Sequence, residues 1–161
     1  MMKAIYPFFQ WADGSLVGTT VRNSRIWFPL LELFHLFALT VLLGATVLLS
    51  LRLLGVVLRK QPLPELAHEL SPWMAGAITV VLASGIPMFL SGALRYYGNT
   101  SFRVKMVFLF CALVFHFAYF RRVVRRDESS LSPVAIKLAG IGALVLWFGV
   151  GLAGRGIGFV G

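Results

Sequence analysis

Four long apolar stretches dominate the hydrophobic pattern of the chain, and each is bounded by polar or basic residues. A helix that crosses the ~30 Å hydrocarbon core of a bilayer needs about 20 mostly apolar residues. Stretches of this length cover residues 27–51, 71–94, 102–120 and 133–154. Serine followed by proline, at Ser71–Pro72 and Ser132–Pro133, is typical of a helix start, because serine caps the helix and proline fits its first turn. The pattern therefore predicts four transmembrane helices.

The short connections between these helices favour one up-down bundle of antiparallel helices. We therefore predict an all-α integral membrane fold with a single domain over residues 27–161. Residues 1–26 lack the charged, apolar and small-residue order of a signal peptide. The aromatic residues of MMKAIYPFFQWAD instead predict a short amphipathic segment that lies in the membrane interface.

Composition supports the membrane interpretation. Of 161 residues, 58% are hydrophobic and only 13% are charged, whereas about a quarter of a soluble domain is charged. These values exclude a soluble enzyme and a disordered chain. The net charge of +9 comes from basic residues that flank apolar stretches, so we expect a lipid bilayer and not nucleic acid as the partner. The densest basic cluster, RRVVRR at 121–126, predicts that this end is cytoplasmic and that both termini are periplasmic.

Ionisable residues inside a membrane span are costly and usually face the bundle interior. Glu32 and His35 lie on a polar stripe of the first helix, and Lys105 and His116 share a face of the third. Antiparallel packing brings several of these residues to one end of the bundle: Glu32, His35, Met88, Lys105, Met106 and Arg155. Two interpretations follow. Glu32 forms a structural ion pair with Lys105 or Arg155, or Lys105 and Arg155 bind an anionic group such as a quinone head, a lipid phosphate or the propionates of haem b.

His35 is the best candidate for a metal ligand. A second histidine, His116, invites comparison with bis-histidine haem proteins, but the two differ by roughly 10 Å in predicted depth. Haem held by His35 with Met88 or Met106 opposite is geometrically easier. Copper is an alternative that would use imidazole, thioether and the Cys111 thiol.

Three functions remain open. The first is a membrane cofactor-binding or electron-transfer subunit with a redox partner. The second is a structural or accessory subunit of a larger membrane complex. The third is a copper-handling protein or small transporter, which we rank last because the paired broken helices of inverted repeats are missing. No hydrolase, zinc-protease or nucleotide-loop motif is present, so we expect no catalytic activity of its own.

Five segments occur in a distinctive order: FPLLELFHL at 28–36, LLGATVLLSLRLLG at 42–55, SPWMAGAITVVLASGIPMFL at 71–90, YYGNTSFRVKM at 96–106 and LWFGVGLAGRGIGF at 146–159. They resemble a family of small bacterial four-helix membrane proteins of unknown function, the DUF6644 type. The resemblance implies a bacterial inner-membrane location and four spans, but no activity. The residues at the family's characteristic positions are Glu32, His35, Arg52, Trp73, Asn99, Lys105 and Arg155.

Two positions depart from the family's pattern. Ser50 stands where the family typically has aspartate, and His116 stands where a threonine or another small residue is expected. The second departure weakens a family-wide bis-histidine haem and places more weight on His35.

Overall fold

The computed structural model of the protein describes residues 2–126 and 130–158. Residues 1, 127–129 and 159–161 lie outside the described residues. The predicted segment 1–26 therefore lacks its first residue in this description, and the predicted domain 27–161 lacks its last three. The described residues form helices and no strands, in the order α1 (Met2–Asp13), α2 (Leu16–Asn23), α3 (Trp27–Leu53), α4 (Leu63–Leu90), α5 (Ala93–Tyr97), α6 (Thr100–Phe115), the π-helical segment η1 (His116–Phe120), α7 (Arg121–Val124) and α8 (Pro133–Gly156).

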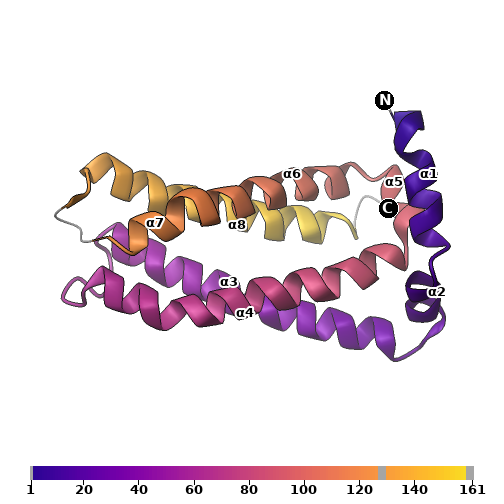
Figure 1. Cartoon of the computed structure of the whole chain (residues 1–161), viewed down its shortest axis with the longest axis horizontal. Helices are drawn as coiled ribbons and strands as arrows, with labels where there is room; N and C mark the ends of the chain where they lie inside the picture. Colours follow the sequence, from indigo (N-terminus) through magenta and orange to yellow (C-terminus); the bar gives the residue numbers. More distant parts are fainter. Residues whose placement is uncertain (1, 127–129, 159–161) are drawn as a thin grey trace.

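Four helices are long and apolar enough to cross a membrane, as predicted: α3, α4, the continuous run Thr100–Val124 and α8. Figure 1 shows them side by side, with consecutive helices running in opposite directions. Helix α3 packs against α4 and α8, and α6 packs against α8. The all-α bundle is therefore confirmed, and the chain is a membrane protein by the length and composition of its helices.

The limits of the second span differ from the prediction. Helix α4 begins at Leu63 instead of Ser71, with Pro62 at its N-cap and Pro64 in its first turn. Proline is tolerated at these positions because the amide proton it lacks has no partner in a helix start. Pro72 consequently lies inside the helix. The predicted start at Ser71 was wrong because two nearby prolines are compatible both with a loop and with a helix start.

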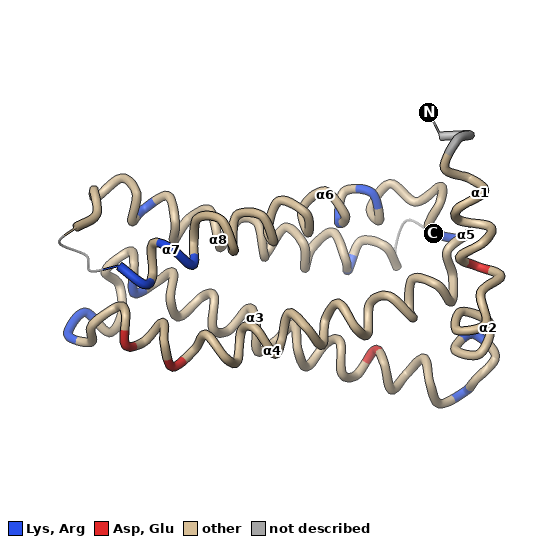
Figure 2. The backbone as a smooth tube through the Cα atoms, viewed as in Figure 1, with Lys and Arg blue, Asp and Glu red and all other residues tan. Residues whose placement is uncertain are grey.

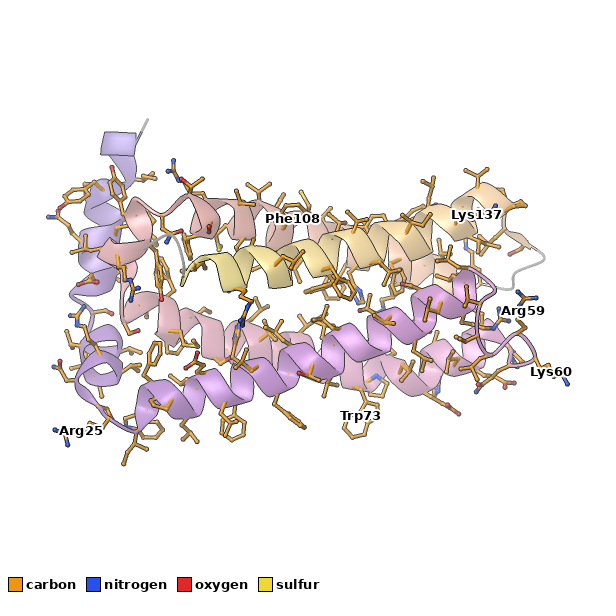
Figure 3. The ribbon with its side chains drawn as sticks, turned by 180° about the vertical axis from the view of Figure 1, so that it is seen from behind. Arg25, Arg59, Lys60, Trp73, Phe108 and Lys137 are labelled. Carbon is orange, nitrogen blue, oxygen red and sulfur yellow. The ribbon has the colours of Figure 1, made fainter. Side chains whose placement is uncertain are left out.

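Small residues allow close contact between α8 and its neighbours. A Cβ added at Gly142 would lie 2.7 Å from Cζ of Phe115, and one added at Gly149 would lie 2.4 Å from Cδ1 of Phe108. Without a hydrophobic drive between helices in lipid, such close contacts provide most of the packing energy. Large side chains elsewhere face outward, as Figure 3 shows for Trp73, which is 67% exposed and available to lipid.

Helices α1 and α2 lie across the end of the bundle (Figure 1). The Ser15 side chain caps α2 by accepting a hydrogen bond from the Gly18 amide at 3.1 Å. Gly18 then packs on the end of α4, where an added Cβ would lie 2.4 Å from the Leu90 carbonyl oxygen. Tyr6 and Phe9 of α1 pack edge-on against Tyr97 of α5. The segment expected in the interface thus forms two helices that cover this end.

Asp13 joins three of these helices. Its carboxylate accepts hydrogen bonds from Arg22 of α2 at 2.7 Å and from the Leu94 amide of α5 at 3.2 Å. Partial burial acts to raise the pKa of Asp13, but these hydrogen bonds and the Arg22 charge outweigh it and lower the pKa below its usual 3.8. The stabilisation is therefore fully present above the unfolded pKa and is lost as the pH falls through the folded value.

Asp13→Asn is expected to reproduce at neutral pH the loosening that acid causes in the wild type. Hydrogen exchange over residues 2–23 should become roughly twofold to fivefold faster, because a partly exposed ion pair contributes about 0.2–1 kcal/mol. The exposed Glu69, which takes no part in this joint, provides the control substitution Glu69→Gln. Equal exchange in both variants would show that the Asp13 contacts do not hold α1 and α2 in place.

Basic residues gather at both ends of the bundle and acidic residues are few (Figure 2). Arg59, Lys60 and Lys137 lie at one end and Arg25 at the other (Figure 3). This distribution places polar residues at two membrane surfaces and leaves an apolar middle, as a four-span protein requires.

Candidate functional site

The site is built where α3 begins, α4 ends, α6 begins and α8 ends. The Asn99 side chain caps α6 by accepting from the Phe102 amide at 3.0 Å and donates to the Ile157 carbonyl at 3.3 Å. This bridge joins the start of α6 to the end of α8. The structure therefore brings together the helix ends that antiparallel packing predicted.

His35 is the central residue of this site. It lies on α3, is only 8% exposed and places Nδ1 2.8 Å from Oγ of Ser84 on α4. The Ser84 hydroxyl donates its one proton to the Val80 carbonyl at 2.6 Å, so it accepts from the imidazole. The Val81 carbonyl is a further backbone partner of the ring. These partners assign the proton of a neutral imidazole to Nδ1 and leave the lone pair on Nε2.

A glycine makes room for this imidazole on α4. A Cβ added at Gly85 would lie 3.3 Å from Cε1 of His35. Because Ser84 and Gly85 are adjacent, one fixes the His35 ring by a hydrogen bond while the other lets it lie against the helix backbone. The orientation of Nε2 is thus set by two neighbouring residues on a rigid helix.

Lys105 supplies the positive charge of the site. It is half-buried on α6, and a Cβ added at Gly154 of α8 would lie 3.6 Å from its Cε and 3.7 Å from its Nζ. Its charge acts on the His35 imidazole. Within residues 2–126 and 130–158 the structure records one ion pair, between Arg22 and Asp13, so Lys105 faces this region without a carboxylate partner.

The predicted ion pair of Glu32 with Lys105 or Arg155 is not formed among the described residues. Glu32 is exposed, because the buried seam of α3 passes through Leu31 and His35 and leaves Glu32 beside it. Its carboxylate instead lies near Tyr96 of α5. Burial raises the pKa of Tyr96 above its usual 10.0 against the opposing charge of Arg95, and the Glu32 charge adds to the rise. Arg155 is exposed near the end of α8.

The two methionines differ in their position. Met88 is half-buried on α4, one turn beyond Ser84, and thus on the His35 side. Met106 is 45% exposed, because it follows Lys105 by one position and is rotated about 100° from it. With Lys105 directed at α8, Met106 faces outward, whereas Met88 lies on the His35 side of α4.

The thiol of the copper alternative, Cys111, is exposed on α6. In the described part of the chain no group of three or more His, Cys, Asp or Glu could hold a metal ion, so His35 belongs to no such group.

His116 lies at a different depth from His35. It lines a cavity with Met74 and Ile78 of α4, whereas His35 contacts Ser84 of the same helix. At 1.5 Å per residue, these contacts are about 9–15 Å apart along α4. One iron needs its axial imidazoles nearly level, so the structure does not bring His35 and His116 together as a pair.

The sequence did not single out Ser84, although its hydroxyl lies 2.8 Å from Nδ1 of His35. A signal was present, because a serine in an apolar helix seldom stays without a partner and a nearby span carries a histidine. The pairing itself could not be found, because it depends on the rotation of α4 against α3.

An aromatic stack closes the site toward the membrane surface. The rings of Phe89, Tyr96 and Phe102 lie nearly parallel, with centroids 5.5 Å apart for Phe89–Phe102 and 5.0 Å apart for Tyr96–Phe102. Phe8 and Phe9 of α1 extend the cluster over Phe89. The site is therefore apolar at its outer boundary and polar at His35 and Lys105.

Comparison with known proteins finds no match among curated proteins and none among solved structures. The sequence does match a family description over residues 8–160, which includes all four spans and the residues of this site. The chain therefore belongs to the family of unknown function DUF6644.

Proposed function

We propose that the protein is a cofactor-binding or electron-transfer subunit of a membrane, and that it binds a planar redox ligand at His35. The observation that carries this proposal is the buried imidazole, whose Nδ1 is held by Ser84 and whose Nε2 keeps its lone pair. A histidine that served only packing would need no fixed tautomer. Histidines that bind metals or exchange protons are characteristically oriented by such a second partner.

The charge of Lys105 restricts the chemical class of ligand that fits the site. Lys105 is half-buried in an apolar setting and has no carboxylate partner among the described residues. An ammonium group in this position favours a carbonyl, phenolate or carboxylate oxygen. A quinone-like ring or b-type haem supplies such oxygens together with a flat apolar surface that the Phe89–Phe102 stack can contact.

Each residue then has a defined task. His35 Nε2 would accept a hydrogen bond from a hydroxyl of a quinone-like ligand, or would hold the iron of haem. Lys105 donates to the ligand's charged or carbonyl oxygen. Ser84 holds the imidazole, and the aromatic cluster restricts water. Bound haem or quinone would supply the electron-carrying chemistry.

We also propose a bacterial inner-membrane location with periplasmic termini, on the basis of the RRVVRR cluster. A one-electron or two-electron carrier requires a redox partner or further membrane subunits. Glu32 supports a neighbouring subunit, because it is exposed on α3 and forms no ion pair within the described residues. A charge inside a span usually faces a partner.

Visible spectroscopy and mass spectrometry of the purified protein test the proposal. A Soret band would identify haem, and an isoprenoid quinone in an organic extract would identify a quinone. His35→Ala is expected to reduce the retained ligand by about tenfold or more, because it removes the ligand-facing imidazole. His68→Ala is the matched control, since His68 is exposed on α4 outside the site.

The proposal fails if the wild-type protein from its native membrane carries neither chromophore nor quinone. It also fails if His35→Ala and His68→Ala retain the same amount of ligand as the wild type.

A further inference from the structure

A second polar site lies at the end of the bundle opposite to His35. Segments of α3, α4, η1 and α7 line a partly open cavity of about 70 Å³. A single water needs about 10–15 Å³ of such space, so the cavity has room for a group of several heavy atoms. Its polar lining comes from Ser71, His116, Arg121 and Arg125, and its lining includes no aspartate or glutamate.

His116 is the buried polar group of this cavity. It is 7% exposed, and its buried Nδ1 has no hydrogen-bond partner among the described residues. Three aromatic rings hold the imidazole in place, with centroid distances of 5.1 Å to Phe117, 5.7 Å to Phe120 and 6.3 Å to Trp147. Buried polar atoms are almost always satisfied in native proteins, so a rigidly held imidazole without a partner indicates that a ligand atom supplies one.

The backbone at His116 is unusual as well. The helix that begins at Thr100 changes to a π-helical turn over His116–Phe120 and returns to an α-helix at Arg121. Such π-turns within α-helices are rare and occur frequently at functional sites. This turn begins at His116 and ends one residue before Arg121. It therefore sets how His116 is placed relative to the two arginines of the cavity.

The charge of the cavity is positive. Arg121 and Arg125 are four residues apart, and both line it. Arg125 Nη2 also donates to Ser71 Oγ at 3.4 Å, which fixes its guanidinium against α4. Guanidinium groups bind phosphate through paired hydrogen bonds, and the cavity has no acidic lining residue to compete with a phosphate.

We propose that this cavity binds a phosphate group through Arg121, Arg125 and His116. The phosphate belongs either to the headgroup of an anionic phospholipid or to free phosphate. The position at the end of the span, where headgroups lie, suits the lipid. The site is separate from His35 and does not depend on the function proposed for it.

Neighbouring arginines provide a matched control for the test. Arg122 and Arg126 belong to the same basic cluster but do not line the cavity. The double variant Arg121→Gln/Arg125→Gln and the control Arg122→Gln/Arg126→Gln therefore lose the same charge. Native mass spectrometry would measure binding of phosphatidylglycerol to protein from phosphatidylcholine nanodiscs. Thermal unfolding in lipid-free detergent would measure binding of inorganic phosphate against chloride at equal ionic strength.

The cavity-lining double variant is expected to weaken phosphate binding by roughly tenfold or more, because it removes two charge-assisted partners. The control should weaken it by less than about twofold, because Arg122 and Arg126 do not line the cavity and act only through screened charge. Binding of phosphatidylglycerol alone identifies a lipid site, and a phosphate-dependent rise in melting temperature identifies a free anion. Either result supports the proposal if the binding is weakened by substitution of the cavity-lining pair and not by substitution of the control pair.

Trp147 provides a local measurement that does not rely on the arginines. Its ring contacts His116, while Trp11, Trp27 and Trp73 are all exposed. After these three are changed to phenylalanine, Trp147 emission should shift when inorganic phosphate or phosphatidylglycerol is added. The proposal is overturned if the wild type binds neither probe, or if both double variants lose binding equally.

Discussion

Replacing Gly149 with alanine is expected to destabilise the bundle, whereas the same change at Gly151 is expected to be neutral or slightly stabilising. A Cβ at Gly149 would lie 2.4 Å from both Cδ1 and Cε1 of Phe108, while at Gly151 it would meet nothing within 4 Å. Overpacking costs about 1–3 kcal/mol. This exceeds the ~1 kcal/mol that alanine gains over glycine inside a helix, so only the Gly149 substitution should lose stability.

The ring of Phe108 is partly buried against the core, and Figure 3 shows it on α6, which runs beside α8. The contact therefore joins α6 to α8, which are separated in the sequence by η1 and the basic cluster at 121–126. Thermal unfolding in detergent would measure both variants. Adding Phe108→Leu to Gly149→Ala should restore part of the lost stability, because the smaller side chain leaves room for the new methyl group. Equal stability of Gly149→Ala and Gly151→Ala would contradict the observed packing of α6 on α8.

The second large effect is expected at Ser84. Changing Ser84 to alanine removes the acceptor that holds His35 Nδ1 at 2.8 Å. The imidazole would then lose its fixed orientation and its preferred tautomer. Loss of such an orienting partner reduces the affinity of a site by about 10-fold to 100-fold. This prediction rests on the function proposed for His35, and titration of the identified haem or quinone into the ligand-free protein would measure it.

Ser91→Ala is the matched control for Ser84→Ala. Ser91 is also buried at 7% exposure, follows α4 directly and donates its hydroxyl to a carbonyl of that helix, that of Met88, at 2.8 Å. The hydrogen bond of His35 is to Ser84 and not to Ser91. If both variants bind the ligand equally, then Ser84 has no positioning role. If neither variant folds, then Ser84→Thr, which keeps the hydroxyl, should retain both the fold and the affinity.

The fold was largely predictable because a membrane places strong constraints on sequence. Every span must be an apolar helix whose backbone groups bond internally. The pattern at residues 27–51 consequently predicted α3 closely. The limits of α4 were missed because the positions of Pro62 and Pro64 are compatible with either a loop or a first turn. The π-turn at His116–Phe120 has no signature in hydropathy, so it could not be predicted.

The sequence could name the residues of the candidate site but not their contacts. His35 and Lys105 were recognised because ionisable side chains inside a span are rare. Their partners depend on rotations of about 100° per residue between neighbouring positions. The rotation of α6 places Met106 outward next to Lys105, and that of α3 leaves Glu32 beside the buried seam. The rotation of α4 places Ser84 and Gly85 against His35.

The sequence by itself determined that this protein belongs in a membrane and how many of its helices are long and apolar enough to cross it, because both follow from length and hydropathy. Only the tertiary structure decided which polar atoms are satisfied and which are not. Ser84 is the hydrogen-bond partner of His35 Nδ1, whereas within residues 2–126 and 130–158 the buried Nδ1 of His116 has none. Those outcomes depend on the depth and rotation at which separate helices pack, and no single helix encodes them.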